Sequence, residues 1–481
     1  MAQWLLVYIL NIKFEREVNS MSLLIKNGTI VTASDTYEGD IYIDKGIVKE
    51  IGINIGKSAD ETINAKGKYV IPGGVDVHTH LNLDVGIAIA NDDFYTGTVA
   101  AACGGTTTIV DHMGFGPKGC NLKHQVDVYH GYAKDKAVID YSFHGVIQHI
   151  NDEILNEMES IVKDEGIPSF KVYLTYDYML NDEEVVKVLK RLRELGGITT
   201  VHCENHGSIK FLRDFYVKNN LKTPKYHPLS RPVEAEGEAV NRMINLAAIS
   251  NDAPLYIVHL SSEIGLSYIK MAHERGENVY AETCPQYLVL DDSKYNLENN
   301  ESLKYMMSPP LRKQSDIDAL WKGVRDGHIK TIATDHCPFA FNKDKQLGKD
   351  DFTKCPNGAP GIEERIPLIF SEGVMKNRIS INKFVEVCCT NPAKIFGMYP
   401  KKGTIQVGSD ADIVIIDPNI KKTIKVEDMH SNVDYTAYEG IKVKGYPIYT
   451  VLRGEIIAKD NTFVGKKGFG KFIKRNQFNM K

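Results

Sequence analysis

Apolar and polar residues alternate in three successive patterns along the chain. From about residue 22 to 72, short apolar runs are separated by glycine-containing turns, which is typical of β-strands. Leu23–Lys26 and Thr29–Thr32 are expected to pair as a hairpin around the turn Asn27-Gly28. Tyr69–Pro72 is the last expected strand of this first block.

From about Gly73 to Phe396, short apolar strands alternate with amphipathic helical stretches such as Glu183–Leu195 and Glu236–Ser250. Eight strand–helix units over this length predict an α/β protein with a (β/α)₈ TIM barrel. The eight expected strands are Val75–His80, Thr107–Asp111, Tyr141–Val146, Ser169–Leu174, Thr199–His202, Leu255–His259, Val279–Thr283 and Thr331–Asp335.

The β pattern returns after residue 400. Further strands are expected at Gly403–Gly408, Asp412–Asp417, Lys442–Val451 and Glu455–Ala458. Blocks of strands on both sides of the barrel predict one β-sandwich domain built from both chain ends. The expected organisation is an N-terminal extension (1–20), the N-terminal segment of the β-sandwich (21–72), the barrel (73–396), the C-terminal segment of the β-sandwich (397–460) and a C-terminal tail (461–481).

The first residues contain an apolar run, Trp4–Ile12, which is far shorter than the roughly 20 residues needed to cross a bilayer. It lacks the basic start and the cleavage site of a signal peptide. We expect Met21 to be the natural start of the protein, with an upstream extension before it; a short surface helix is the alternative. No membrane association is expected.

Charge and cysteine content narrow the functional classes. The net charge is −4, and the basic residues gather only near the end, from Lys466 to Arg475. The composition therefore gives no reason to expect a nucleic-acid partner. The eight cysteines form no C-x-x-C pair. They are expected to be reduced thiols of a cytoplasmic protein.

Two histidines, His78 and His80, close the first expected barrel strand. Residues two apart on a strand point to the same face. Both imidazoles are therefore expected at the C-terminal mouth of the barrel, where barrel enzymes keep their active sites. An H-x-H pair by itself is a moderate signal for a metal site.

Potential ligands at other strand ends strengthen the signal. His202, His259 and Asp335 end the fifth, sixth and eighth expected strands, and Lys171 lies inside the apolar fourth strand. A buried lysine cation is costly, so Lys171 is either a salt-bridged core residue or a lysine carboxylated by carbon dioxide to N6-carboxylysine. The resulting carbamate is an anionic ligand able to bridge two cations.

Imidazole and oxygen ligands without thiolates suit zinc, with manganese or iron(II) as alternatives. Two such divalent ions share a hydroxide and polarise a carbonyl. Asp335 is expected to contact one ion, take the proton of the attacking water and pass it to a leaving nitrogen. This division of roles favours amide hydrolysis.

Several motifs resemble the amidohydrolase superfamily and, within it, the hydantoinase/dihydropyrimidinase family, over nearly all of the chain from Met21 to about Arg475. Its phenylhydantoinase branch is the most similar, judged by the segments 111–117 and 141–146. The other segments that carry the resemblance are Pro72–His80, Asp92–Phe94, Thr96–Thr98, Gly104–Thr107, Glu282–Leu288, Ser308–Arg312, Thr334–Cys337 and Asn357-Gly358.

The resemblance implies a role for each candidate residue. His78, His80 and Asp335 hold the more buried metal, and His202 and His259 hold the more exposed one. Carboxylated Lys171 bridges the two. By the same resemblance, the Tyr176 hydroxyl stabilises the oxyanion, and main-chain groups of Ser308 and Asn357 bind the cyclic imide.

Structural interpretations stay open for some of these residues. Tyr176 also suits an aromatic wall, Ser308 a turn before proline, and Asn357-Gly358 an ordinary turn. Three further histidines and two cysteines are interpreted as supporting or packing residues: His112, His206, His336, Cys284 and Cys337.

The implied reaction opens a 5-monosubstituted hydantoin, with aryl substituents favoured, or a dihydropyrimidine, to an N-carbamoyl amino acid. The segment Leu81–Ile87 after His80 and the pair Asp111-His112 depart from the usual family pattern, so substrate choice stays open. Allantoinases and dihydroorotases share the metal site, but Asn82 stands where dihydroorotases usually carry an arginine. A catalytically inert scaffold homologue is a further alternative, which the complete ligand set opposes.

The basic tail has three interpretations. It is a solvated chain end, a site for an anionic partner, or, as the resemblance implies, an arm that docks on a neighbouring subunit of a homotetramer.

Overall fold

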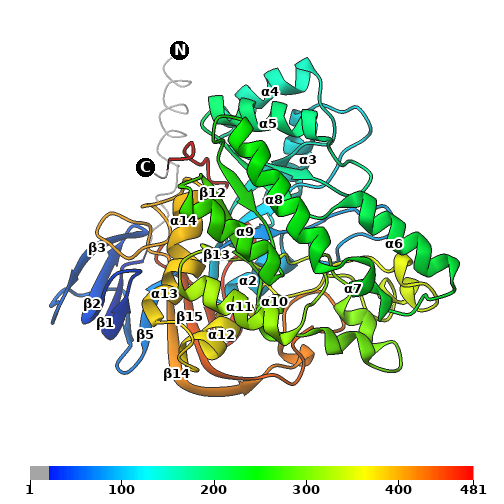
Figure 1. Cartoon of the computed structure of the whole chain (residues 1–481). Coiled ribbons are helices and arrows are strands. Elements are labelled where there is room, and N and C mark those ends of the chain that lie inside the picture. Colours follow the sequence, from blue (N-terminus) through cyan, green and yellow to red (C-terminus); the bar gives the residue numbers. More distant parts are fainter. Residues whose placement is uncertain (1–20, 480–481) are drawn as a thin grey trace, which may run out of the picture.

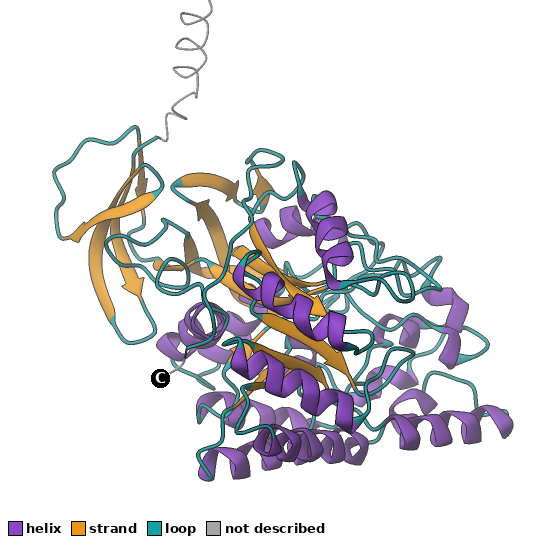
Figure 2. Ribbon diagram, turned by 90° about the horizontal axis from the view of Figure 1, so that it is seen from above, coloured by secondary structure: helices purple, strands orange, loops and turns teal. Residues whose placement is uncertain are grey.

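The structure of the protein, a computed structural model, describes residues 21–479. The predicted extension over residues 1–20 lies outside the described residues. The described part of the chain combines a barrel of parallel strands surrounded by helices with a sheet on one side of it (Figures 1 and 2). Within it, no helix is long and apolar enough to span a membrane.

The barrel confirms the predicted fold class. Eight strands pair with their neighbours in sequence order, parallel throughout. The first and last strands meet through the backbone bonds Asp335 N–H to His78 O and His80 N–H to His336 O, of 2.8 and 2.9 Å. The barrel strands are β6 (Gly74–Thr79), β7 (Thr106–His112), β8 (Asp140–Val146), β9 (Ser169–Tyr173), β10 (Ile198–His202), β11 (Leu255–Ile257), β12 (Val279–Thr283) and β13 (Thr331–Ile332).

Several helices begin where a polar side chain caps the first turn. Side-chain oxygens of Asn121, Asn151, Asn181, Asn205 and Ser262 accept hydrogen bonds from main-chain N–H groups at the starts of α3, α4, α5, α6 and α9. The α-helices are α2 (Thr96–Cys103), α3 (Leu122–Ala133), α4 (Asp152–Lys163), α5 (Asp182–Glu194), α6 (His206–Lys218), α7 (Tyr226–Ser230), α8 (Val233–Ile249), α9 (Glu263–Glu274), α10 (Pro285–Val289), α11 (Gln314–Arg325), α12 (Arg365–Ile369), α13 (Ile381–Val385) and α14 (Asn391–Ile395).

Shorter helical turns complete the barrel loops. Two π-helical turns continue α12 and α13, and tight 3₁₀ turns lie mainly in the loops after β12 and β13. They are η1 (Asp292–Asn296), η2 (Glu301–Tyr305), η3 (Lys345–Gly348), η4 (Phe352–Lys354), η5 (Phe370–Val374), η6 (Glu386–Thr390) and η7 (Val426–Asp428).

The strands outside the barrel come from both chain ends, as predicted, and join in one nine-stranded sheet. Its halves meet where β5 pairs antiparallel with β14. The hydrogen-bonded order is β17-β16-β15-β14-β5-β1-β2-β3, with β4 beside β1. The strands are β1 (Leu23–Val31), β2 (Thr36–Asp44), β3 (Ile47–Gly52), β4 (Glu61–Asn64), β5 (Tyr69–Pro72), β14 (Ile413–Thr423), β15 (Lys442–Leu452), β16 (Glu455–Lys459) and β17 (Thr462–Phe463).

Two local predictions are wrong. Asn27-Gly28 forms no hairpin turn, because β1 runs through it with a bulge. Asn27 takes a φ of +60°, and a Cβ on Gly28 would lie 2.5 Å from Val70 Cγ2. The two residues therefore form the bulge and let the main chain of Gly28 lie close to Val70 within the sheet. Gly403–Gly408 is a loop instead of a strand, and both glycines have positive φ.

The end of the chain crosses the N-terminal end of its own barrel. Main-chain N–H groups of Gly470, Ile473 and Arg475 donate to Ala137 O, Tyr141 O and Gly166 O. The Arg475 guanidinium is buried and donates to Ser142, Phe143 and Ser169. The tail therefore lies at the opposite end of the barrel from the C-terminal strand ends.

Candidate metal centre

All six predicted metal ligands line one cavity at the C-terminal ends of the barrel strands. The cavity has a volume of about 1100 Å³. It brings together residues that lie far apart in the chain, because parallel strands end on the same side of a barrel. The cavity wall includes His78, His80, Lys171, His202, His259 and Asp335, and also Tyr176, Ser308 and Asn357.

Three of these ligands converge on one point. The Nε2 atoms of His78 and His80 are 3.2 Å apart, and each lies 3.1 Å from Asp335 Oδ1. Ligands at about 2.0–2.2 Å from one cation lie about 3.0–3.5 Å from one another. The three atoms therefore fit a single divalent cation.

His202 and His259 form the second pair of imidazoles. His202 Nδ1 and His259 Nε2 are 2.9 Å apart. His202 Nε2 lies 2.7 Å from a Glu204 oxygen, and Glu204 also pairs with Arg231. When His202 Nε2–H donates a hydrogen bond to the Glu204 carboxylate, the His202 Nδ1 lone pair faces His259 and is available to a cation.

Lys171 is almost fully buried and, among residues 21–479, forms no ion pair. Its ammonium lies 5.4 Å from the centre of the Tyr173 ring. Burial lowers the pKa of Lys171 to about 8, although the charges of Asp335 and Glu282 oppose this shift. A neutral amine is the form that reacts with carbon dioxide, so this environment favours the carboxylation predicted for Lys171.

The backbone is unusual at three candidate residues. Tyr176, His259 and Asp335 have φ values of +75°, +40° and +54°. Non-glycine residues rarely adopt this region, and such strain gathers at functional sites. The surrounding structure therefore holds these side chains in orientations that an unstrained strand end would not provide.

Comparisons with known proteins agree with this geometry. A model of the amidohydrolase family matches residues 69–457. The chain belongs to the amidohydrolase family. The resemblance inferred from its motifs is thereby confirmed.

Individual relatives of this amidohydrolase cover almost its whole length. It is 53% identical over 459 residues to a D-phenylhydantoinase of Escherichia coli K12, which spans 95% of this chain and 99% of that protein. A dihydropyrimidinase structure from Brevibacillus agri NCHU1002 superposes with a TM-score of 0.94 at 47% identity, covering 96% of this chain and 100% of that one. A D-hydantoinase structure from Bacillus sp. AR9 gives a TM-score of 0.93 at 46% identity, with coverages of 95% and 100%.

The structure adds a carboxylate to the predicted site of this amidohydrolase. Glu282, at the end of β12, contacts His78 Nδ1 through Oε1, and the same oxygen accepts the His259 N–H at 3.1 Å. Its other oxygen accepts the Tyr256 hydroxyl at 2.9 Å. Glu282 thus contacts one histidine of each pair, the ring of His78 and the main chain of His259. In the sequence, Glu282 is an acidic residue within the apolar strand Val279–Thr283 and opens the segment Glu282–Leu288 that carries part of the resemblance, but no role was predicted for it.

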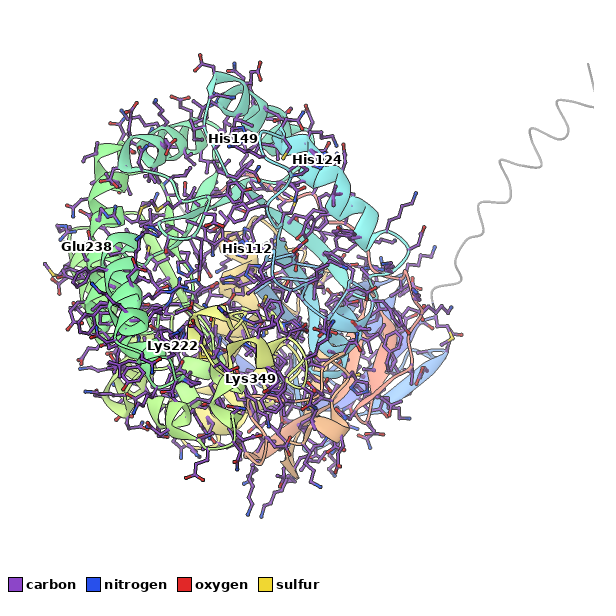
Figure 3. All side chains as sticks on the ribbon, turned by 90° about the vertical axis from the view of Figure 1, so that its right-hand side faces the viewer. His112, His124, His149, Lys222, Glu238 and Lys349 are labelled. Atoms are coloured by element: carbon purple, nitrogen blue, oxygen red, sulfur yellow. The ribbon has the colours of Figure 1, made fainter. Side chains whose placement is uncertain are left out.

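The three histidines interpreted as supporting residues lie beside a candidate ligand, in the cavity wall or next to Asp335 in the chain. The His112 ring stacks on His144 with centroids 4.1 Å apart, and it lies 4.3 Å from the His78 ring. Figure 3 shows His112 near the middle of the barrel. His336 Nε2 contacts Asp92 at 3.0 Å, and His206 Nδ1 contacts Thr175 at 3.2 Å.

The predicted packing cysteines are confirmed as buried thiols. Cys284 and Cys337 are both buried, and all eight cysteines are free. Burial raises the pKa of each of these two thiols, which opposes a role as thiolate nucleophile.

Replacing Glu282 by glutamine is expected to weaken metal binding about 10- to 100-fold, because partners that orient metal-bound histidines contribute about that much to affinity. The measurement is metal content after dialysis against a graded metal buffer. Glu363→Gln is the matched control, since Glu363 is also buried and contacts a histidine, His430 at 2.9 Å, outside the cavity. Equal metal loss in both variants would contradict the role of Glu282.

Metal binding is expected to release protons. Burial opposes a proton on His78, but Glu282 and Asp335 outweigh it and raise the pKa of His78 to about 9, while the pKa of Lys171 is about 8. Both groups therefore hold a proton near neutral pH without metal, and a cation displaces the His78 proton. Apparent metal affinity should rise as the pH approaches 9. Calorimetric titration in buffers of different ionisation enthalpy checks this, and a pH-independent affinity would refute it.

Proposed function

We propose that this chain opens cyclic amides of the hydantoin and dihydropyrimidine type by metal-dependent hydrolysis, giving N-carbamoyl amino acids. It is a hydrolase, in agreement with its similarity to a D-phenylhydantoinase and a dihydropyrimidinase over nearly the whole chain. The observation that carries the proposal is the convergence of His78, His80 and Asp335 at mutual distances of 3.1–3.2 Å inside the cavity.

The metal centre would be held by the six predicted ligands. When bound, two divalent cations would supply Lewis-acid activation of a water molecule and of a ring carbonyl. Zinc is our proposal for both ions, with manganese or iron as alternatives, and carbon dioxide would carboxylate Lys171 to N6-carboxylysine. The ligands are His78, His80, Lys171, His202, His259 and Asp335.

The protein's own groups divide the remaining work. Asp335 accepts a proton from the attacking water and returns it to the ring nitrogen that leaves. Burial raises the pKa of the Tyr176 hydroxyl, so it stays protonated and donates to the negative charge that develops on the ring carbonyl oxygen. Main-chain groups of Ser308 and Asn357 hold the imide edge of the ring.

The cavity wall supports a preference for aryl substituents. Apolar side chains from the segment after β6 and from the loop after β7 line the cavity beside the metal ligands: Leu83, Val85, Ile87, Met113 and Phe115. Such a wall suits a flat apolar substituent at ring carbon 5. We therefore place phenylhydantoin ahead of dihydrouracil as substrate.

The decisive experiment compares the hydrolysis of phenylhydantoin and dihydrouracil by metal-loaded and chelator-stripped protein. Metal-dependent opening of phenylhydantoin with little action on dihydrouracil is expected. The reverse preference would correct the substrate class. Opening of neither ring would reject the proposal and direct the assay to allantoin and dihydroorotate, or to an inert scaffold homologue.

Two further expectations concern the setting of the reaction. The buried free cysteines agree with the predicted reduced thiols of a cytoplasmic protein. The homotetramer, with the tail as its docking arm, stays a prediction. The tail contacts described here lie within one chain, so they leave that prediction untested.

A further inference from the structure

Two loop segments in the cavity wall present unpaired main-chain groups. Ser308 and Asn357 line the cavity, and their side chains contact each other, with Asn357 Nδ2 donating to Ser308 Oγ at 2.8 Å. Among residues 21–479, the main-chain N–H groups of both residues have no hydrogen-bond partner. Under the proposed function these main-chain groups bind the ring, so the direction in which they point decides whether a ring is bound.

Peptide planarity fixes the direction of these groups. In a trans peptide the C=O and the following N–H point in opposite directions. The Asn357 N–H therefore points away from whatever binds Pro356 O. In the next peptide, Gly358 N–H donates to Met306 O at 2.9 Å, so Asn357 C=O points away from Met306. The hydrogen bonds of Pro356 O and Gly358 N–H therefore set the directions in which the N–H and C=O groups of Asn357 point.

One side chain binds the first of these halves, Pro356 O, directly and the second through Met306 O, the acceptor of Gly358 N–H. The Lys345 ammonium donates to Met306 O, Pro356 O and Gly358 O at 2.8, 2.8 and 2.6 Å. An ammonium has three donors, so these three carbonyls satisfy it completely. Lys345 is fully buried and, within the described residues, forms no ion pair with a carboxylate.

The neighbouring packing leaves little freedom to this arrangement. Gly358 has a φ of +145°, and a Cβ there would lie 2.4 Å from Cys337 O. The Cys355 thiol contacts Lys345 O at 3.5 Å. The loops around Met306 and Pro356 are well separated in the chain, and Lys345 is a direct link between them. Burial lowers the pKa of Lys345, and its three hydrogen bonds to carbonyl oxygens offset part of the cost of burying the cation.

We propose that Lys345 is a positioning residue for ring recognition: by binding Met306 O, Pro356 O and Gly358 O, it aims the main-chain groups of Asn357 at a cyclic imide in the cavity. This inference rests on the proposed function. Lys345 itself does not touch the substrate, the metals or the reacting atoms. Lys345 therefore strengthens binding of the ring equally in the ground state and in the transition state. Replacing it should change KM rather than kcat.

The test compares wild type, Lys345→Gln and Lys345→Met as metal-loaded full chains with phenylhydantoin. Methionine keeps the unbranched apolar stem of the side chain as far as Cε but donates no hydrogen bond, and glutamine donates up to two. KM is expected to rise about tenfold or more in Lys345→Met and less in Lys345→Gln, with kcat within about threefold and metal content unchanged. Wild-type turnover is measured first and tests the proposed function, whereas the KM ratios test Lys345.

Val188→Ala is the matched control for a general loss of stability. Val188 is buried in α5 and does not line the cavity. It should lower the unfolding midpoint and leave KM unchanged. An unchanged KM in both Lys345 variants, or a fall in kcat alone, would overturn the proposal. If Lys345→Met does not fold, the KM of Lys345→Gln relative to that of Val188→Ala decides.

Discussion

Asp335→Asn should lower kcat for phenylhydantoin by about a thousandfold, the usual contribution of a general acid–base residue. Asparagine keeps the shape and one ligand oxygen but accepts no proton at that position. Burial would raise the pKa of Asp335, yet His78 and His80 hold it well below the ordinary value. The carboxylate is therefore ionised and ready as a base across the neutral range. Steady-state kinetics with metal analysis measures the effect.

Metal content separates two explanations for such a loss. If Asp335→Asn keeps its metal and loses kcat, the carboxylate acts on protons. If the metal is lost in proportion to activity, Asp335 acts only as a ligand. Asp92→Asn is the control: Asp92 is a buried carboxylate that contacts a histidine, His336 at 3.0 Å, but it does not line the cavity. A kcat for Asp335→Asn within about tenfold of wild type would contradict the proposed proton transfer.

Lys171→Ala is expected to abolish detectable turnover, because the proposed carbamate, an anion that would bridge two cations, is lost together with its charge. Alanine leaves a space in β9 where the buried side chain had been. A small carboxylate such as acetate has the charge and the two oxygens of the proposed carbamate. Added acetate should therefore restore part of the activity and part of the bound metal.

Two comparisons make the rescue specific to Lys171. Acetamide has the same shape as acetate but no charge, so it should not restore activity. Asp335→Asn should gain nothing from acetate, because its defect lies in proton transfer. If Lys171→Met, which cannot be carboxylated, retains wild-type activity and metal content, the carbamate proposal is wrong.

Much of the barrel and of the metal site followed from local sequence pattern. Period-two spacing placed His78 and His80 on one face of a strand, and apolar runs located the eight barrel strands to within a few residues. Since parallel strands end on one side of a barrel, the positions of His202 and Asp335 at strand ends predicted that they meet. The hairpin predicted at Asn27-Gly28 was wrong, because the same two residue types occur in hairpin turns and in β-bulges. Only the contact of Gly28 with Val70 distinguishes the two.

Tertiary structure alone decided which side chains contact the candidate metal ligands and the main-chain groups of the cavity wall. Glu282 lies 204 residues from His78, and Lys345 lies 39 residues from Met306, so no local pattern links either pair. A buried carboxylate or ammonium is identifiable as a residue type, but its partners depend on how distant loops pack together. The sequence therefore predicted the fold and a set of candidate metal ligands that meet in one cavity, and packing decided the contacts by which we propose that Glu282 and Lys345 aim the groups for metal and ring.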